Sequence, residues 1–298
     1  MGLLFGIAAY GIWALFPFYF RAVDYVSSIE VIANRIIWSF VLLTIIMTVT
    51  GRWRGLREAA GDRKALGLVA LGAVFVAANW STYVIAISTN HALQASLGYF
   101  INPLVIVGLG VFVLKERLRP AQWWAVGIAA LAVLILTISY GSLPWIALIL
   151  AFSWATYGFI KRYVGWGAIE STAVETGVLT PVALAVMAVL LLHGTSVFFA
   201  DGLSTSLLLM LAGPITTIPL LFFTGAATRV PFSTLGLLQY ITPIGLFIVG
   251  VAFFGEEMSS TRWVGFALIW VALIVFTIDA RRHMRATSLA DAQLLPEE

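Results

Sequence analysis

The chain contains no cysteine, only three histidines and few charged residues. Asp, Glu, Lys and Arg make up 10% of its 298 residues, whereas an average soluble domain has about 25%. Without cysteine, neither a disulfide framework nor a thiolate metal site is possible. With so few histidines as well, zinc and redox chemistry are close to excluded, and we expect no metal and no cofactor.

Several catalytic and nucleotide-binding motifs are also missing. The sequence has no H-E-x-x-H, no G-x-S-x-G and no G-x-x-x-x-G-K-[ST], and it has no paired aspartates for a metal-bound diphosphate. We therefore predict that the chain is not an enzyme and that no nucleotide-binding subunit is implied.

Apolar residues are abundant. They form 61% of the chain, and the mean hydropathy is +1.00, which is more apolar surface than a soluble domain can bury. This predicts an integral membrane protein in contact with lipid. The formal charge of +3 does not indicate a nucleic-acid partner, because the basic residues lie in short clusters between apolar runs. The apolar start lacks a basic leader, so we expect a first span and not a signal peptide.

A helix needs about 20 apolar residues to cross the hydrocarbon core of a bilayer, and by this measure we expect ten spans. The fold class is therefore an all-α polytopic membrane protein with ten transmembrane helices. The expected spans are Leu3–Phe20, Val31–Val49, Leu66–Ser88, Leu93–Leu114, Ala121–Tyr140, Leu143–Ile160, Thr172–Leu192, Leu207–Ala227, Ser233–Phe254 and Trp263–Asp279.

The distribution of Lys and Arg predicts the orientation. Of the 17 basic residues, Arg35 lies inside a span. With a cytoplasmic N-terminus, only Arg21 and Arg262 fall outside, and all others, including Lys161, fall in inside segments. We expect both termini in the cytoplasm of a bacterium, and the protein in the inner membrane. Residues 281–298 form a polar tail that we expect to be disordered.

The sequence repeats itself after 140 residues. A gapless shift places Asn102-Pro103 on Thr242-Pro243 and Glu116 on Glu256. This divides the chain into residues 1–141 and 142–280, with five spans each. Since five is odd, the second half must insert upside down, which gives a 5+5 inverted repeat around a central cavity. Such repeats are common in secondary transporters, where two halves expose one midplane site to each side in turn.

Prolines interrupt three spans near polar side chains. Each proline should leave the carbonyl four residues earlier without its helical partner. For Pro17, Pro103 and Pro243 these are the carbonyls of Trp13, Tyr99 and Gln239. We expect five side chains to line a midplane site at these kinks, and ordinary packed kinks are the alternative. The five are Tyr99, Asn102, Gln239, Tyr240 and Thr242.

Other polar and aromatic residues share helix faces. Asn79 and Tyr83 are one helical turn apart, and Trp154 and Tyr157 are nearly so. Trp13 is the approximate equivalent of Trp154 in the sequence repeat. We expect these side chains to form an aromatic, mostly uncharged cavity. The alternative is an interfacial belt of Tyr and Trp.

Charged residues occur near the ends of spans. Glu30 and Arg35, near one face, could form a gate-side pair, while snorkelling or local pairing is the commoner explanation for them and for Glu170 and Glu175. We expect Glu116 and Glu256 to be structural anchors at helix ends more than substrate ligands. No acidic residue or histidine lies mid-span in spans 1, 3, 4, 6, 8 or 9, so we expect proton coupling to be weak or absent.

Several motifs resemble the EamA type of the drug/metabolite transporter superfamily, and within it the RarD-like subgroup. They are residues 95–104 (ASLGYFINPL), residues 233–241 (STLGLLQYI), residues 34–39 (NRIIWS), Glu116 and Glu256. The resemblance covers nearly the whole chain. It implies a ten-helix inverted repeat with a cavity built mainly from spans 1, 3, 4, 6, 8 and 9. It also implies movement of small organic solutes, since amino-acid exporters are among the relatives.

We therefore predict a secondary transporter that exports amino acids or related small metabolites by alternating access. Efflux of amphiphilic drugs or other small solutes is the alternative. A membrane enzyme would need catalytic residues that the sequence lacks, and a scaffold would not need two kinked polar helices.

Overall fold

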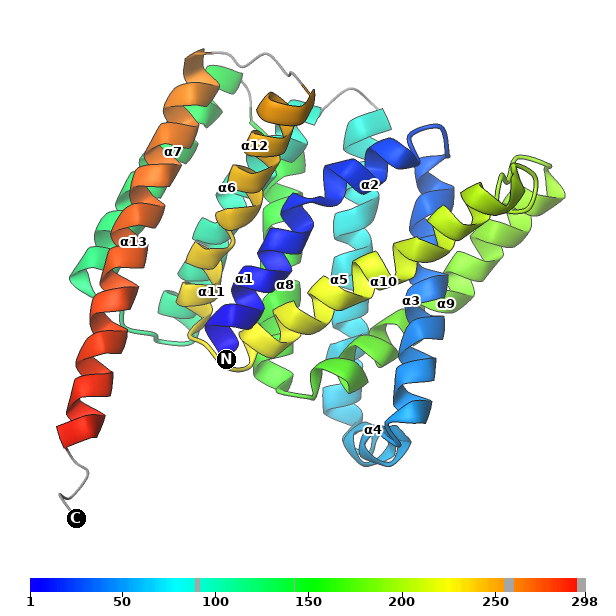
Figure 1. Ribbon diagram of the computed structural model, residues 1–298, viewed down its shortest axis with the longest axis horizontal. Helices are drawn as coiled ribbons and strands as arrows, with labels where there is room; N and C mark the ends of the chain where they lie inside the picture. Colours follow the sequence, from blue (N-terminus) through cyan, green and yellow to red (C-terminus); the bar gives the residue numbers. More distant parts are fainter. Residues whose placement is uncertain (89–91, 142, 255–259, 294–298) are drawn as a thin grey trace.

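The computed structural model describes residues 1–88, 92–141, 143–254 and 260–293, and these ranges contain helices and no strand (Figure 1). The predicted all-α class is confirmed for them. The helices are α1 (Gly2–Ala14), α2 (Phe16–Ala22), α3 (Ser28–Val49), α4 (Trp53–Ala60), α5 (Arg63–Ser88), α6 (Ala92–Gly108), the π-helical turn η1 (Leu109–Val113), α7 (Pro120–Tyr140), α8 (Trp145–Val164), α9 (Ala168–Leu192), α10 (Gly202–Ala227), α11 (Phe232–Leu238), α12 (Ile241–Phe254) and α13 (Ser260–Gln293).

Within the described ranges, seven helical segments are long and apolar enough to cross a membrane, against ten predicted spans. The segments Leu97–Val113 and Trp263–Asp279 are apolar but shorter. Helix α8 belongs to neither group, and its last turn carries Lys161 and Arg162. Large apolar side chains such as Phe112 and Trp124, each 72% exposed, cover the outer surface, as expected of helices that face lipid.

Two pairs of helices begin at the spacing of the sequence repeat. Helices α3 and α9 begin 140 residues apart, at Ser28 and Ala168, and helices α5 and α10 begin 139 residues apart, at Arg63 and Gly202. The duplication is therefore visible in the backbone as well as in the sequence.

The two halves are not broken at the same place. In the first half the backbone is interrupted at Leu15, between α1 and α2, next to Pro17. In the second half it is interrupted between α11 and α12, next to Pro243. Pro103 lies inside α6 without ending it. The expected kink therefore becomes a helix break at Pro17 and Pro243 but not at Pro103.

The prediction that these breaks free a carbonyl is wrong at two positions. The amide of Thr242 donates to the Gln239 carbonyl at 3.1 Å, and a backbone N–H at the end of α1 donates to the Trp13 carbonyl. Tight turns at the breaks re-pair these acceptors, as buried backbone requires. The polarity of the site must therefore come from side chains.

Contacts between distant segments define two ends of the molecule. At the end that holds the N-terminus (Figure 1), Arg52 pairs with Glu170 at 2.9 Å, and Arg119 pairs with Asp279. At the opposite end, Tyr25 bonds Thr205. Segments predicted to share a side of the membrane therefore lie together.

Helix α13 continues to Gln293, where a disordered tail is predicted, because residues 281–293 are rich in helix-favouring Ala, Arg, Met and Leu.

Candidate functional site

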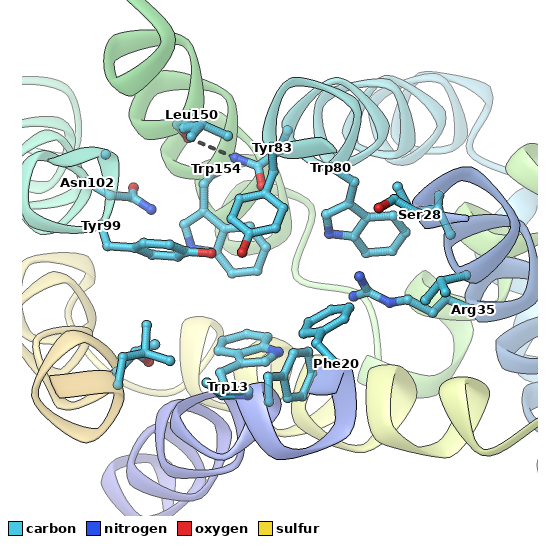
Figure 2. A pocket seen from close by; sticks show the side chains of 18 of the residues that line it. Trp13, Phe20, Ser28, Arg35, Trp80, Tyr83, Tyr99, Asn102, Leu150 and Trp154 are labelled. Atoms are coloured by element: carbon cyan, nitrogen blue, oxygen red, sulfur yellow. Dashed lines mark hydrogen bonds between the residues drawn. The ribbon is translucent and has the colours of Figure 1, made fainter. Parts of the chain in front are cut away.

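A cavity of about 520 Å³ lies between the two halves, within the range of about 300–1,000 Å³ typical of small-molecule sites. Helices α1, α2, α3, α5, α6, α8 and α12 line it, together with Gln239 at the α11–α12 break. The resemblance implied a wall from the eighth span, but α10 contributes no lining residue, and α3 contributes several. Figure 2 shows the cavity from close by.

Eight of the ten side chains predicted to form the site line this cavity. They are Trp13, Asn79, Tyr83, Tyr99, Asn102, Trp154, Gln239 and Thr242. The other two, Tyr157 and Tyr240, are fully buried and do not line it. Tyr157 donates to Glu175 at 3.1 Å, and Tyr240 donates to the Phe100 carbonyl at 3.3 Å. Both side chains support the wall from behind, because burial and a hydrogen bond fix their rings.

Residues related by the sequence repeat meet in the wall of the cavity or directly behind it. Tyr240 and Phe100, which are 140 positions apart, are joined by the hydrogen bond just described. The rings of Trp13 and Trp154, 141 positions apart, meet edge to face with centroids separated by 5.1 Å. Contacts between equivalent residues place the cavity at the junction of the two halves. One site therefore receives side chains from both copies.

The amide side chains of the wall are unequally satisfied. Asn79 donates to the Leu150 carbonyl at 2.8 Å and to Ser153 at 3.0 Å (Figure 2). In contrast, the side-chain amide oxygens of Asn102 and Gln239 have no hydrogen-bond partner, and neither does the indole nitrogen of Trp154. Buried polar atoms normally have partners. These unpaired atoms are buried within the wall, so they do not themselves face a solute in the cavity.

Arg35 is the residue that sequence reasoning misjudged most. It was predicted to pair with Glu30 or to snorkel, but its side chain is 9% exposed and lines the cavity. Its Nε donates to Thr216 at 2.9 Å, and its guanidinium lies 4.7 Å from the centre of the Trp80 ring. The cavity, which is predicted to be mostly uncharged, therefore has a buried cation in its wall. Since Arg35 is seven residues into α3, about 10 Å along the helix axis, its depth was a signal in the sequence.

Glu30 has a different role from the one proposed for a gate-side pair. Its carboxylate accepts the Ser196 hydroxyl at 2.6 Å and the amides of Val197 and Phe198 at 3.1 and 3.2 Å. These bonds hold the segment between α9 and α10 against α3. The carboxylate is fully engaged there, so it cannot neutralise Arg35.

Lys161, which is predicted to lie in a cytoplasmic segment, is buried inside the protein. Its side chain is 1% exposed and pairs with Glu175 at 2.7 Å. Ser171 and Thr172 also accept from the ammonium. Local pairing, the predicted explanation for Glu175 and Glu170, is what the structure contains, because Glu170 pairs with Arg52.

Glu116 binds the start of α11. Its two carboxylate oxygens accept the amides of Phe232 and Ser233 at 2.6 and 2.8 Å and the Ser233 hydroxyl at 2.7 Å. A carboxylate at a helix N-terminus satisfies free amides and the helix dipole. This contact joins the two halves at the end of the molecule that holds the N-terminus. Its equivalent, Glu256, lies outside the described residues.

The cavity is open at one end. Asp24 and Ser28, at the α2–α3 junction, line it and are exposed. Beyond Tyr10 and Trp13, at the other end, packing is complete: Phe223 and Leu235 are fully buried. A solute could thus enter from the α2–α3 side and would meet a floor at the aromatic cluster.

Comparison with known proteins identifies the family. The model of the EamA-like transporter family matches residues 1–138 and 143–278. Protein RarD of Streptomyces exfoliatus is 47% identical over 95% of this chain and 90% of its own, and Protein RarD of Escherichia coli is 42% identical over 96% and 97%. A solved crystal structure with 20% identity covers 94% of this chain and 98% of its own with a TM-score of 0.72, which supports the fold alone.

These matches agree with the resemblance carried by residues 95–104 and 233–241. The protein is a multi-pass membrane transporter and not an enzyme. The chain belongs to the EamA-like transporter family, within the drug/metabolite transporter superfamily, and its close relatives are RarD proteins.

Proposed function

We propose that the protein is a secondary transporter that exports amino acids or related small metabolites across the bacterial inner membrane by alternating access. The observation that carries this proposal is a cavity at the junction of two repeated halves, lined by both and exposed at the α2–α3 junction. Alternating access needs such a site, so that rocking one half against the other exposes it to each side.

The ten-span inverted repeat is part of this proposal. It is supported by helices α3 and α9, which start 140 residues apart, and by family matches on either side of residues 139–142. The sidedness is supported by the basic residues Arg52, Arg119 and Arg162, whose contacts gather at one end. With that end in the cytoplasm, the cavity faces outward and the Glu116 contact closes the cytoplasmic side.

Solute binding at this cavity has a physical basis in its wall. Trp13, Tyr83 and Trp154 offer apolar faces, while Asn102 and Gln239 contribute amide side chains. Such a combination suits a solute with an apolar body and a few hydrogen-bonding groups. Efflux of amphiphilic drugs remains the second candidate, favoured by the same aromatic faces.

Counterflow in liposomes tests the function. Purified protein is reconstituted into vesicles loaded with one unlabelled solute, and uptake of the labelled solute is followed. The panel contains free amino acids, their N-acetyl derivatives and hydrophobic cations. We expect exchange of amino acids or their derivatives, with strong loss in Asn79→Ala and Tyr99→Ala, which alter the wall but leave the charges intact. Exchange of hydrophobic cations alone would favour drug efflux, and no exchange of any solute would contradict the proposal.

The same vesicles test coupling. No acidic side chain was found mid-span in the helices expected to form the wall, so exchange should proceed without an imposed pH difference. A strict requirement for a pH difference would contradict that expectation.

A further inference from the structure

The guanidinium of Arg35 is an unneutralised cation inside the cavity. In the part of the chain that the structure describes, no carboxylate lies within 4.0 Å of it, because the ion pairs found there involve other residues. An unpaired charge at this depth in a membrane helix costs several kcal/mol and is characteristic of functional sites. The fold keeps this charge without supplying a counter-charge, which requires an explanation.

The surroundings of Arg35 hold the group in place but do not satisfy it. Thr216 accepts from Nε, and the rings of Trp80, Phe16 and Phe20 lie 4.7, 5.8 and 5.8 Å from the guanidinium carbon. Aromatic faces stabilise a cation and fix its plane, but they accept no conventional hydrogen bond. None of these contacts gives the two terminal guanidinium nitrogens of Arg35 a hydrogen-bond partner. Figure 2 shows the guanidinium pointing into the cavity between Trp80 and Phe20.

We propose that the cavity is an organic-anion site, in which Arg35 binds the carboxylate of a small solute whose apolar or aromatic body lies against Trp13, Tyr83 and Trp154. This rests on the proposed transport function and narrows its substrate class. A guanidinium fixed at Nε presents its two terminal N–H groups side by side, the geometry that matches both oxygens of a carboxylate.

The rest of the cavity selects against other charges. A cationic solute would be repelled by Arg35, and a free amino acid would bring its ammonium close to the guanidinium. Asp24 lines the cavity but is exposed at the mouth, where water screens its charge. The unpaired amide oxygens of Asn102 and Gln239 belong to α6 and the α11–α12 break, away from α3. Amino acids whose amine is acylated or absent therefore fit better than zwitterions.

In Figure 2 the Asn102 amide and the Arg35 guanidinium point inward from opposite sides of the cavity, with Trp13, Tyr83 and Trp154 between them. A carboxylate at one side and an acyl carbonyl, which accepts from an amide N–H, at the other would use both polar groups of an N-acylated amino acid, and its side chain would meet the rings. The chemistry on each side thus matches a different part of one solute class.

A charge series on one molecular body tests the proposal. The full-length protein is placed in lipid discs of zwitterionic lipid, and binding is followed by its tryptophan fluorescence, since Trp13, Trp80 and Trp154 line the cavity. The probes are N-acetyl-phenylalanine, which is anionic, its neutral amide, zwitterionic phenylalanine and cationic phenylalaninamide. We expect the anion to bind about 10- to 100-fold more tightly than the neutral amide, the range of a charge-assisted hydrogen-bonded pair, and the cation to bind least.

Variants assign the preference to Arg35. In Arg35→Gln the anion and the neutral amide should bind alike, while Arg35→Lys should keep part of the preference. Arg54→Gln is the matched control, because Arg54 forms an exposed pair with Glu58 away from the cavity, and it should bind like the unaltered protein. If Arg35→Gln does not fold, the charge series on the unaltered protein still decides. Equal binding of the anion and the neutral amide, or binding of none of the four, would overturn the proposal.

A lipid phosphate is the other oxyanion that could meet Arg35. If anionic lipid altered the fluorescence through Arg35 while N-acetyl-phenylalanine had no effect, the group would serve lipid binding and the proposal would fall. The proposed transport function fails in a different way. If the protein bound the anion selectively but exchanged no solute, the anion site would stand and only the transporter role would be contradicted.

Discussion

In the part of the chain that the structure describes, two basic side chains are buried, and their surroundings differ. Lys161 on α8 is 1% exposed and pairs with Glu175 at 2.7 Å, with hydroxyl groups around both. Arg35 on α3 is 9% exposed and has one neutral hydrogen bond and three aromatic neighbours. The chain neutralises one cation and leaves the other facing a cavity. The difference indicates that Lys161 contributes to stability and Arg35 to binding.

The largest effect should come from breaking the neutralised pair. Glu175→Gln leaves the Lys161 ammonium buried without a counter-charge and should lower the free energy of unfolding by about 3–5 kcal/mol. Equilibrium unfolding in mixed detergent micelles measures this. Glu58→Gln is the control, because that carboxylate is in an exposed pair and should change stability by less than about 1 kcal/mol. A loss in Glu175→Gln no larger than in the control would show that the buried pair is not structural.

Replacing both members of the pair sharpens the test. The double variant Lys161→Met with Glu175→Leu should be more stable than Glu175→Gln, because it removes the buried charges together. The same unfolding measurement applies. If the double variant were less stable than Glu175→Gln, the ion pair itself would stabilise the fold, and removing both charges would not restore that stability.

Arg35→Gln should have the opposite effect, with little change in stability and a large loss of binding. It removes an uncompensated buried charge, so the free energy of unfolding should stay within about 1 kcal/mol or rise. Binding of an anionic solute should fall about 10- to 100-fold. Unfolding and fluorescence titration of the same preparation measure both. A large loss of stability with unchanged binding would place Arg35 in the same structural class as Lys161.

The smallest expected effects concern the neutral hydroxyl partner of each cation. Thr216→Val removes the acceptor for Arg35 Nε, and Ser171→Ala removes one for Lys161; each bond is worth about 0.5–1.5 kcal/mol. Thr216→Val should weaken anion binding several-fold with little change in stability. Ser171→Ala should lower stability and leave binding unchanged. Exchanged outcomes would contradict the division between the two cations.

The elements of the fold that could be predicted are those with a long-range pattern. The 140-residue shift predicts two halves, and apolar length located most helices to within a few residues, although α13 continues past the predicted end at Asp279 to Gln293. The breaks were harder, because a helix is interrupted next to Pro17 and Pro243 but continues through Pro103. Neighbouring helices, which the local sequence does not specify, decide whether a helix continues through a proline.

The candidate site was predictable where residue type and helix face sufficed. Asn79, Tyr99 and Gln239 line the cavity as expected, because a polar group in the middle of a span must face something polar. Arg35 was misjudged for the opposite reason. Its partner was sought nearby in the sequence, at Glu30, but Glu30 is engaged by residues 196–198, more than 160 positions away. Which acid neutralises which base depends on packing between segments.

The most direct test of the account is counterflow of labelled N-acetyl-phenylalanine in liposomes that contain the unaltered protein, Arg35→Lys, Arg35→Gln or the control Arg54→Gln. We predict rapid exchange in the unaltered protein and in Arg54→Gln, slower exchange in Arg35→Lys, and loss of at least about 90% of the rate in Arg35→Gln, which corresponds to a tenfold change. Equal rates in Arg35→Gln and Arg54→Gln would contradict the claim that this cavity carries organic anions through Arg35.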